Sequence, residues 1–184
     1  IVYLEDYRVT LSELLTPACD VSEQISLAGT EASGTGNMKL MLGGAITLGT
    51  YDGANVEIHE QVGDENIMIF GMRTEEVAAL RQRGYAPGEY YEKDPLIQDL
   101  INTLYEGISG SKFPEIADSL KNFDPYMVLA DFHAYIEAQE KIQQLYRQPE
   151  VWSRMSLMNI AGSGVFCADR AVEEYAHRIW HLTK

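Results

Sequence analysis

A glycine-rich segment that leads into a helical pattern carries the residues of this chain best suited to chemistry. It reads GTEASGTGNMK, from Gly29 to Lys39. Glycines let backbone N–H groups approach a ligand closely because no Cβ intervenes. A helix that begins near Asn37 adds unpaired N–H donors and the positive end of the helix dipole. The segment therefore predicts an anion site, most simply for a phosphate, with Lys39 about one turn inside the helix.

A phosphate site beside an amine is the chemistry that holds pyridoxal phosphate as a Schiff base. Two commoner phosphate motifs each fail at one required residue. Gly29 and Gly34 have the P-loop spacing, but Thr35 stands where that motif needs lysine. Gly34 and Gly36 begin a dinucleotide fingerprint, but Lys39 occupies the place of its third glycine. The remaining alternative is a flexible glycine-rich turn before a helix with a surface lysine.

Composition excludes several classes of partner. The chain has 184 residues, a length typical of one domain, and a formal net charge of −14. Such acidity argues against nucleic acid and against an anionic membrane surface, and the apolar runs are too short to span a bilayer. Cys19 and Cys167 are far apart and read as reduced cysteines of a cytoplasmic protein. His177 and His181 share a helix face, but surface histidines are the favoured reading and no metal site is predicted.

The first part of the chain, residues 1–72, has the pattern of an α/β fold. We expect strands and short helices to alternate there, at Ile1–Leu4, Leu11–Leu15, Lys39–Leu42, Ala45–Leu48 and Ile67–Phe70. Asp20 and Glu23 have the spacing of a capping box, which indicates a helix start. Strand, helix and strand in this order indicate βαβ units and a parallel sheet, which binds ligands beyond the carboxyl ends of its strands.

The second part, residues 73–184, is predicted to be mainly helical. Helices are expected from Thr74 to Gly84, from Asp94 and Pro95 to Glu106, and from Pro149 to Gly162. A long amphipathic helix between the last two has one apolar face, formed by Phe132, Tyr135, Ile136, Ile142, Leu145 and Tyr146. Asp169 is expected to cap a last helix with four residues facing inward, namely Val172, Tyr175, Ile179 and Leu182.

The beginning of the chain is unusual, because it starts without Met and directly in an apolar run. Ile1–Leu4 reads as a buried parallel strand, which needs neighbours on both edges. We therefore expect this chain to be cut from something longer.

The run EASGTGNMKLMLGGAITLGTYDGANVEIHE, from Glu31 to Glu60, resembles the cofactor-lysine region of the α-glucan phosphorylases, the glycogen, starch and maltodextrin enzymes. The preceding IVYLEDYRVTLSELLTPACDVSEQISLAGT and the later ENIMIFGMRTEEV and RGYAPGEYY are also similar to that family. The resemblance is strong from Ile1 to about Tyr91 and looser beyond. It implies the C-terminal part of a Rossmann-like domain of the two-domain, GT-B type glycosyltransferase fold, followed by a helical region.

The resemblance also implies roles for individual residues. Lys39 would carry pyridoxal phosphate as a Schiff base, and the other cofactor-binding residues would be Tyr7, Arg8, Gly34, Thr35 and Gly36. The glucosyl unit would lie against the loop formed by Glu31, Ala32, Ser33 and Gly34. The segment Asp52–Asn55 reads from its own letters as a turn and helix start that holds the neighbouring loop.

The implied reaction is reversible phosphorolysis of an α-1,4-glucan by phosphate, which gives glucose 1-phosphate, in a cytoplasmic homo-oligomer. In the family, the basic residues that bind substrate phosphate come from an earlier segment, so the isolated chain is expected to be inactive and to self-associate. Two alternatives remain. A nucleotide-sugar glycosyltransferase of the same fold would need no pyridoxal, although Lys39 after GTGN disfavours it. The other alternative is a non-catalytic interaction module.

Overall fold

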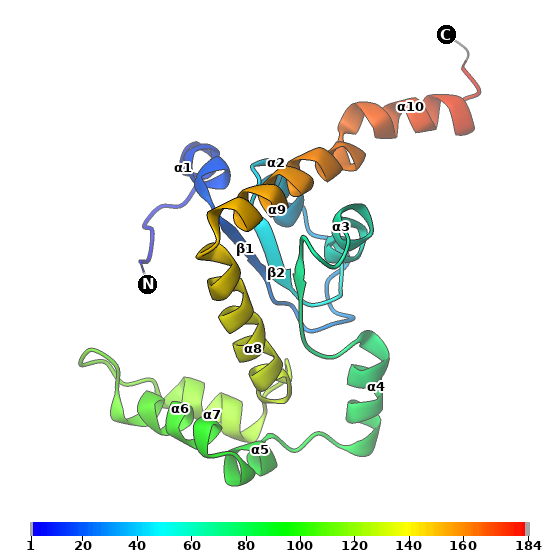
Figure 1. The fold of residues 1–184 in the computed structure, drawn as a ribbon. Helices are drawn as coiled ribbons and strands as arrows, with labels where there is room; N and C mark the ends of the chain where they lie inside the picture. The colour runs from blue at the N-terminus through cyan, green and yellow to red at the C-terminus, as the bar shows by residue number, and fades with distance from the viewer. Residues whose placement is uncertain (1, 183–184) are drawn as a thin grey trace.

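The structure, a computed structural model, describes residues 2–182 and has a small parallel sheet at its centre (Figure 1). The strands are β1 (Val21–Gln24), β2 (Ile46–Gly49) and β3 (Met68–Ile69), in the order β1-β2-β3. In the register of the two pairs, Val21 lies opposite Ile46 and Leu48 opposite Met68. The chain is therefore a mixed α/β protein with a parallel sheet, as its sequence pattern predicts.

Helices cover both faces of this sheet. On one face, Ile46, Leu48 and Met68 pack against α8 (Val128–Tyr146) and α9 (Pro149–Gly162). On the other face, α2 (Gly36–Leu42) and α3 (Ala54–Val62) contribute a second core, formed by Met41, Ile58, Val62 and Ile67 with Ile69 partly buried against it. Successive strand residues point to opposite faces, which explains why Met68 and Ile69 belong to different cores.

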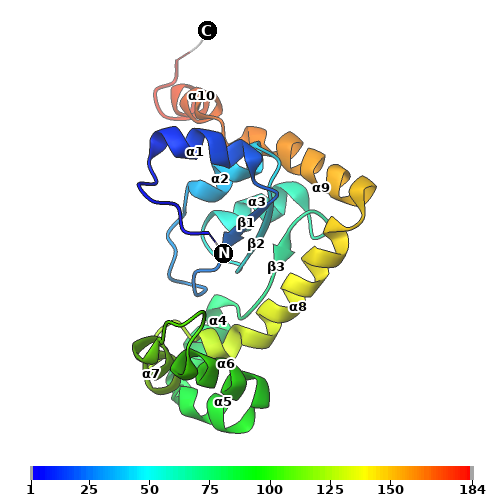
Figure 2. The same cartoon turned by 90° about the vertical axis from the view of Figure 1, so that its left-hand side faces the viewer.

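A separate group of helices forms the lower lobe in Figures 1 and 2. It contains α5 (Pro87–Lys93), α6 (Pro95–Glu106) and α7 (Pro114–Asn122), and α4 (Thr74–Arg83) leads into it from the sheet. Ile97, Ile101 and Ala117 form its core together with Leu129 from the first turn of α8. The long helix α8 thus joins the helical lobe to the sheet.

The remaining elements lie toward the two ends of the chain. They are α1 (Val9–Leu15) and the 3-10 turn η1 (Thr16–Ala18) before the sheet, and the 3-10 turn η2 (Ser163–Phe166) and α10 (Ala168–Arg178) after α9. Figure 2 shows α1 beside α2, and η1 contacts α2. This arrangement brings the N-terminal segment next to the helix that carries Lys39.

Several helices of the second half have the predicted bounds, whereas α5 and α7 were not predicted and the N-cap of α4 is Arg73, not Thr74. The Asp94 carboxylate accepts hydrogen bonds from the backbone N–H groups of Leu96 and Ile97, at 2.9 and 3.3 Å, and so caps α6. The helix expected from Pro149 to Gly162 has those bounds, and α4 begins at Thr74 and ends before Gly84. A side-chain cap therefore marks the start of α6, and a proline at the first helical position marks the start of α9.

Two expectations near the N-terminus are wrong, one of a strand and one of a helix start. Residues Val2–Leu4 form no strand and are exposed, while Ile1 lies outside the described residues. In contrast, β1 occupies Val21–Gln24, where Asp20 and Glu23 suggested a helix start. A strand needs a partner to hydrogen-bond with. β1 has one in β2, and Val2–Leu4 has none among residues 2–182.

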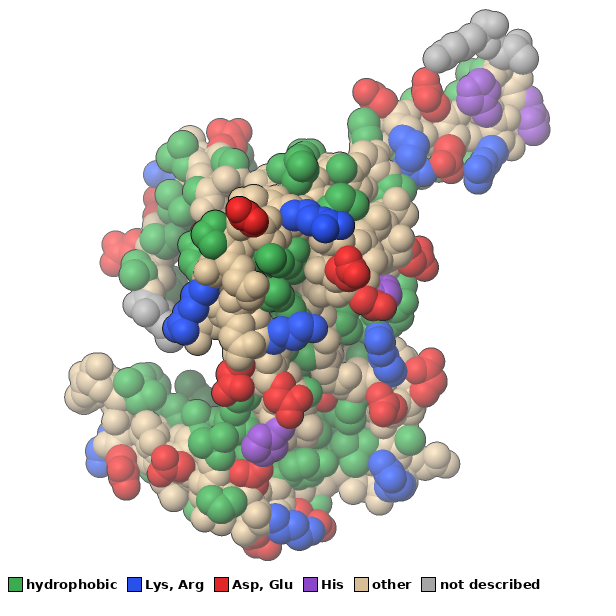
Figure 3. Space-filling view, in the orientation of Figure 1, with side chains coloured by type: hydrophobic (Ala, Val, Ile, Leu, Met, Phe, Trp, Pro, Cys, Tyr) green, Lys and Arg blue, Asp and Glu red, His purple; other side chains and the backbone are tan. Residues whose placement is uncertain are grey.

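The last helix differs from expectation in its packing. α10 begins at Ala168 with Cys167 as N-cap, and Asp169 lies in its first turn. The residues expected to face inward are exposed by half or more of their surface: Val172, Tyr175, Ile179 and Leu182. Figures 1 and 3 show α10 projecting from the body with acidic, basic and histidine side chains along it. Its apolar face therefore has no packing partner within the described part of the chain.

None of the helices in residues 2–182 has the length and apolarity needed to cross a membrane. The same residues contain no cluster of three or more His, Cys, Asp or Glu residues suited to a metal ion.

Candidate cofactor and sugar site

The segment between β1 and α2 is held in place by the turn that follows β2. One carboxylate oxygen of Asp52, Oδ2, accepts hydrogen bonds from the backbone N–H groups of Thr30 and Glu31, at 3.1 and 2.8 Å. The N–H group of Ala54 donates to the carbonyl of Ser33 at 2.6 Å. The prediction that Asp52–Asn55 holds the neighbouring loop is confirmed by these contacts.

Gly53 lets the two segments approach each other. Its φ is +50°, and a Cβ at this position would lie 2.5 Å from the Ser33 carbonyl oxygen and 2.9 Å from Glu31 Cγ. Both its conformation and its contacts therefore require glycine. The loop that carries Glu31 rests directly on backbone here.

A buried amide pair connects α2 to the start of α3. Asn37 Nδ2 donates to Asn55 Oδ1 at 2.9 Å, and both residues are 3% exposed. Asn55 Nδ2 donates in turn to the carbonyls of Thr50 and Gln24, at 2.9 and 3.3 Å. Because the carbonyls lie at the carboxyl ends of β1 and β2, this pair ties the first turn of α2 to the sheet.

These contacts enclose a small polar hollow of about 30 Å³ at the carboxyl ends of the strands. Its walls include Glu31, Ser33 and Gly34 from the loop, with Asn37, Asp52 and Asn55 around them. The Glu31 side chain is exposed, and its Oε1 accepts from the Ser33 N–H at 3.4 Å. A carboxylate beside amide and hydroxyl groups suits a ligand rich in hydroxyl groups.

A second, larger hollow lies between α1 and α2. It is open, measures about 700 Å³, and brings Tyr7 and Arg8 together with Lys39, which lies far from them in sequence. Val9 and Leu42 add apolar wall to it. This volume is within the usual range for small-molecule sites.

The charged groups of this hollow are accessible. Arg8 pairs with Asp6 at 2.9 Å, and both side chains are about 70% exposed. Lys39 is exposed and forms no ion pair within residues 2–182. An exposed pair of this kind contributes little to stability, so both cations are accessible to an anionic ligand. One acidic residue, Glu13, also lines the hollow.

Three residues implied by the resemblance line neither hollow. Ala32 and Thr35 are exposed loop residues, and Gly36 is an exposed residue at the start of α2. Gly36 begins α2, whose seven residues form a short helix. The structure thus gathers Tyr7, Arg8 and Lys39 in one hollow and Glu31, Ser33 and Gly34 in the other, with α2 between the two.

Asn37 is the site residue that sequence reasoning missed. Its position inside GTGNMK gave it no role apart from the helix start. A polar residue on the core side of a short helix was the available signal, because a buried amide needs a partner. The partner, Asn55, lies 18 residues away and could not be read from spacing.

A parallel sheet with a polar loop at the carboxyl ends of its strands is the arrangement at which proteins of the α/β class bind ligands. The model of the carbohydrate phosphorylase family matches residues 1–182, and the chain belongs to that family. It is 52% identical to bovine liver glycogen phosphorylase over 186 aligned positions and 50% identical to the human liver enzyme, in each case over 99% of this chain. It is 52% identical to the muscle glycogen phosphorylase of Macaca fascicularis over 98% of this chain.

The comparisons also give the scale of the match. This chain spans 22% of the length of each of these relatives. The resemblance noted in the sequence to phosphorylases is therefore confirmed for a segment of such an enzyme.

Proposed function

We propose that this chain supplies the cofactor-lysine part of an α-glucan phosphorylase. The parent enzyme would release glucose 1-phosphate from an α-1,4-glucan by phosphorolysis. The observation that carries the proposal is the meeting of Tyr7, Arg8 and Lys39 in one open hollow beside the Glu31 loop. Glycogen phosphorylases at about half identity over nearly the whole chain support the same reaction.

The residues of the large hollow fit pyridoxal phosphate by their chemistry. Lys39 Nζ is an exposed amine that can bond to the aldehyde carbon of the cofactor with release of water. The Arg8 guanidinium and the Tyr7 phenol offer a cation and a hydroxyl donor, and Val9 and Leu42 give apolar surface for a ring. In this proposal Gly34, Thr35 and Gly36, which lie outside the large hollow, are further cofactor residues that offer backbone and hydroxyl donors. The cofactor, when bound, supplies a phosphate group for proton transfer with the substrate phosphate.

The Glu31 loop is proposed to hold the glucosyl unit. The Glu31 carboxylate accepts hydrogen bonds from sugar hydroxyl groups, while Ala32, Ser33 and Gly34 offer backbone N–H donors. Asp52 and Gly53 keep this loop at the carboxyl ends of the strands, so the acceptor and the donors are arranged before a sugar arrives. Such preorganisation favours binding because less order is lost on complex formation.

We further propose that the isolated chain lacks phosphorolysis activity. A dianionic substrate beside a second phosphate needs strong positive compensation. Of the described residues that line the large hollow, two are basic, Arg8 and Lys39. The parent would be a cytoplasmic homo-oligomer of the GT-B fold, in which residues 1–72 and 73–184 form parts of one cofactor-binding domain.

Reduction with borohydride in the presence of pyridoxal phosphate tests the cofactor assignment. The chain should gain one reduced pyridoxal phosphate adduct, and peptide mapping should find it on Lys39. The variant Lys39→Arg keeps the charge but cannot form the bond, so it should gain no specific adduct. An adduct that maps to Lys112 or Lys121 instead, or equal labelling of the variant, would contradict the assignment.

The same experiment distinguishes the phosphorylase segment from the main alternative, a nucleotide-sugar glycosyltransferase segment. A nucleotide-sugar glycosyltransferase segment would show no saturable labelling of Lys39, and a uridine or adenosine diphosphate sugar would bind in its place. The exposed, unpaired Lys39 beside Tyr7 and Arg8 favours the phosphorylase segment.

A further inference from the structure

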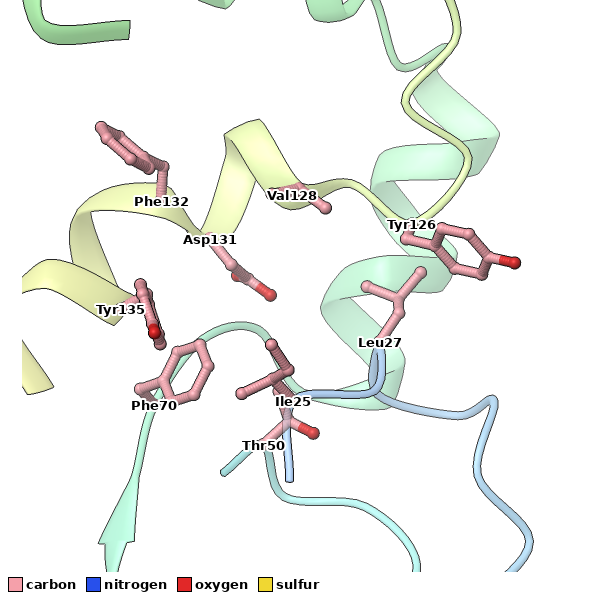
Figure 4. A pocket seen from close by; sticks show the side chains of 9 residues that line it. All are labelled: Ile25, Leu27, Thr50, Phe70, Tyr126, Val128, Asp131, Phe132 and Tyr135. Carbon is pink, nitrogen blue, oxygen red and sulfur yellow. The ribbon is translucent and has the colours of Figure 1, made fainter. Parts of the chain in front are cut away.

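A third cavity lies apart from the lysine hollow, at the carboxyl ends of all three strands. Its floor is formed by the residues that directly follow the strands: Ile25 after β1, Thr50 after β2 and Phe70 after β3. Its other walls come from Leu27, from Tyr126 and from the first two turns of α8 (Figure 4). In parallel sheets this edge is where ligands bind.

The walls of this cavity are predominantly apolar and aromatic. Its aromatic residues are Phe70, Tyr126, Phe132 and Tyr135, and its aliphatic residues are Ile25, Leu27 and Val128. The cavity measures about 190 Å³. For comparison, an apolar cavity of about 150 Å³ accepts a benzene molecule, so this one has room for a single ring with a short substituent.

One carboxylate stands in this apolar surrounding. Asp131 Oδ1 accepts a hydrogen bond from the Met72 N–H at 2.8 Å, and Oδ2 has no hydrogen-bond partner among residues 2–182. Figure 4 shows the carboxylate pointing into the space that the labelled side chains surround. Gly71 passes close to it: a Cβ there would lie 2.8 Å from Asp131 Oδ2. The glycine therefore leaves the second oxygen open.

No cation balances this carboxylate within the described residues. Burial raises the pKa of Asp131, and the neighbouring acids Glu76 and Asp124 raise it further. A half-buried carboxylate with one hydrogen bond and acidic neighbours gains from a positively charged partner. Because the walls around it are aromatic, that partner can also interact with π faces.

We propose that this cavity binds a small organic cation, one aromatic ring carrying a protonated amine or amidine, with the cation on Asp131 Oδ2. The ring fills the space between Ile25, Leu27 and Val128, and the charge meets the carboxylate. The site shares Thr50 with the sugar hollow and none of its residues with the lysine hollow. Its walls are therefore separate from those of the hollow around Lys39, so its occupation does not require pyridoxal phosphate.

The test compares two probes of the same shape, benzylammonium and benzyl alcohol, on the 184-residue chain with labelled Ile, Leu and Val methyl groups. Benzylammonium should shift the methyl signals of Ile25, Leu27 and Val128 in a saturable manner, with an affinity at least tenfold higher than that of the alcohol. This comparison within the unmodified chain needs no variant. Absence of saturable shifts at these methyls, or equal affinity for the two probes, would overturn the proposal.

Asp131→Asn tests the role of the charge. The variant keeps an oxygen for the Met72 N–H and should lose the tenfold preference for the cation. Asp99→Asn is the matched control, because Asp99 is an exposed residue of α6 that does not line the cavity and the change in net charge is the same. A preference that survives in Asp131→Asn, or that is lost equally in Asp99→Asn, would show that the cation does not meet Asp131.

Discussion

The attachment of the Glu31 loop to Asp52 gives a prediction that can be worked out from the hydrogen bonds. Asp52 Oδ2 accepts two backbone N–H groups, those of Thr30 and Glu31. A hydrogen bond to a charged group contributes about 1.5–3 kcal/mol. Since both bonds are exposed to solvent, we take the lower limit for the pair. Asp52→Ala should therefore lower the free energy of local opening by about 1.5 kcal/mol, which is about a tenfold change.

Amide hydrogen exchange measures this opening directly. In Asp52→Ala the Thr30 and Glu31 amides should exchange about tenfold faster, while amides of the sheet keep their rates. Asp52→Asn retains a neutral acceptor, so exchange at these two amides should be about threefold faster than in the unmodified chain, between that chain and Asp52→Ala. Asp99→Ala removes an exposed carboxylate elsewhere and serves as the control. Unchanged exchange at both amides in Asp52→Ala, or equal acceleration in the control, would refute the reasoning.

Asp52 also separates the two proposed parts of the site. It lines the small polar hollow beside Glu31 and does not line the larger hollow that contains Lys39. Borohydride labelling of Lys39 should therefore be unchanged in Asp52→Ala. A loss of labelling in that variant would show that the loop and the cofactor lysine depend on the same contacts.

Three further predictions concern stability and its dependence on pH. Gly53→Ala should lower the Tm by about 4–8 °C more than Gly63→Ala. Both glycines have positive φ, but a Cβ at Gly53 would overlap with the Ser33 carbonyl oxygen, while a Cβ at Gly63 would have nothing within 4 Å. Such overlap costs about 2 kcal/mol. In urea unfolding, Asn55→Ala should cost about 2–4 kcal/mol, and more than Asn37→Ala, because it leaves more buried polar groups without partners; the reverse order would contradict the arrangement. Burial raises the pKa of Asp131, so the folded chain holds that proton to higher pH than the unfolded chain. Its contribution to stability is therefore largest in acid and declines as pH rises through the raised pKa, and Asp131→Asn should remove this decline from unfolding curves measured between about pH 3 and about pH 7.

The helical half of the fold could be predicted because its signals are local. Asp94 and Pro95 define the start of α6 by a side-chain cap and a fixed φ, and Pro149 and Gly162 bound α9. These groups act within one turn of the chain, so no knowledge of distant residues is needed.

The wrong predictions for the strands and for α10 have the opposite origin, because they depend on distant packing or pairing partners that local sequence does not reveal. β1 contains Ser22, Glu23 and Gln24, a polar run that becomes a strand through pairing with β2. Val2–Leu4 has the apolar composition of a strand but pairs with nothing among the described residues. In α10 the amphipathic pattern is real, yet within residues 2–182 its apolar side chains stay exposed.

The candidate site shows the same division. The glycine-rich loop and Lys39 were found because their letters are contiguous, and the resemblance added Tyr7 and Arg8, which the fold then brings beside Lys39. The hydrogen bond between Asn37 and Asn55 could not be predicted, because it joins two helices at the ends of the strands. The cavity at Asp131 joins residues from Ile25 to Tyr135, and no spacing rule connects them.

The position of α2 explains how one short helix serves two hollows. Residues two apart on a helix point about 200° away from each other. Asn37 is buried and bonds to Asn55 at the sugar side, and Lys39 is exposed and faces the open hollow beside Arg8. The tie at Asn37 thus fixes the rotation of the helix, and that rotation determines where Lys39 points. Asn37→Ala should consequently reduce the rate of Lys39 labelling even though Asn37 does not line the lysine hollow, whereas Asp52→Ala should not.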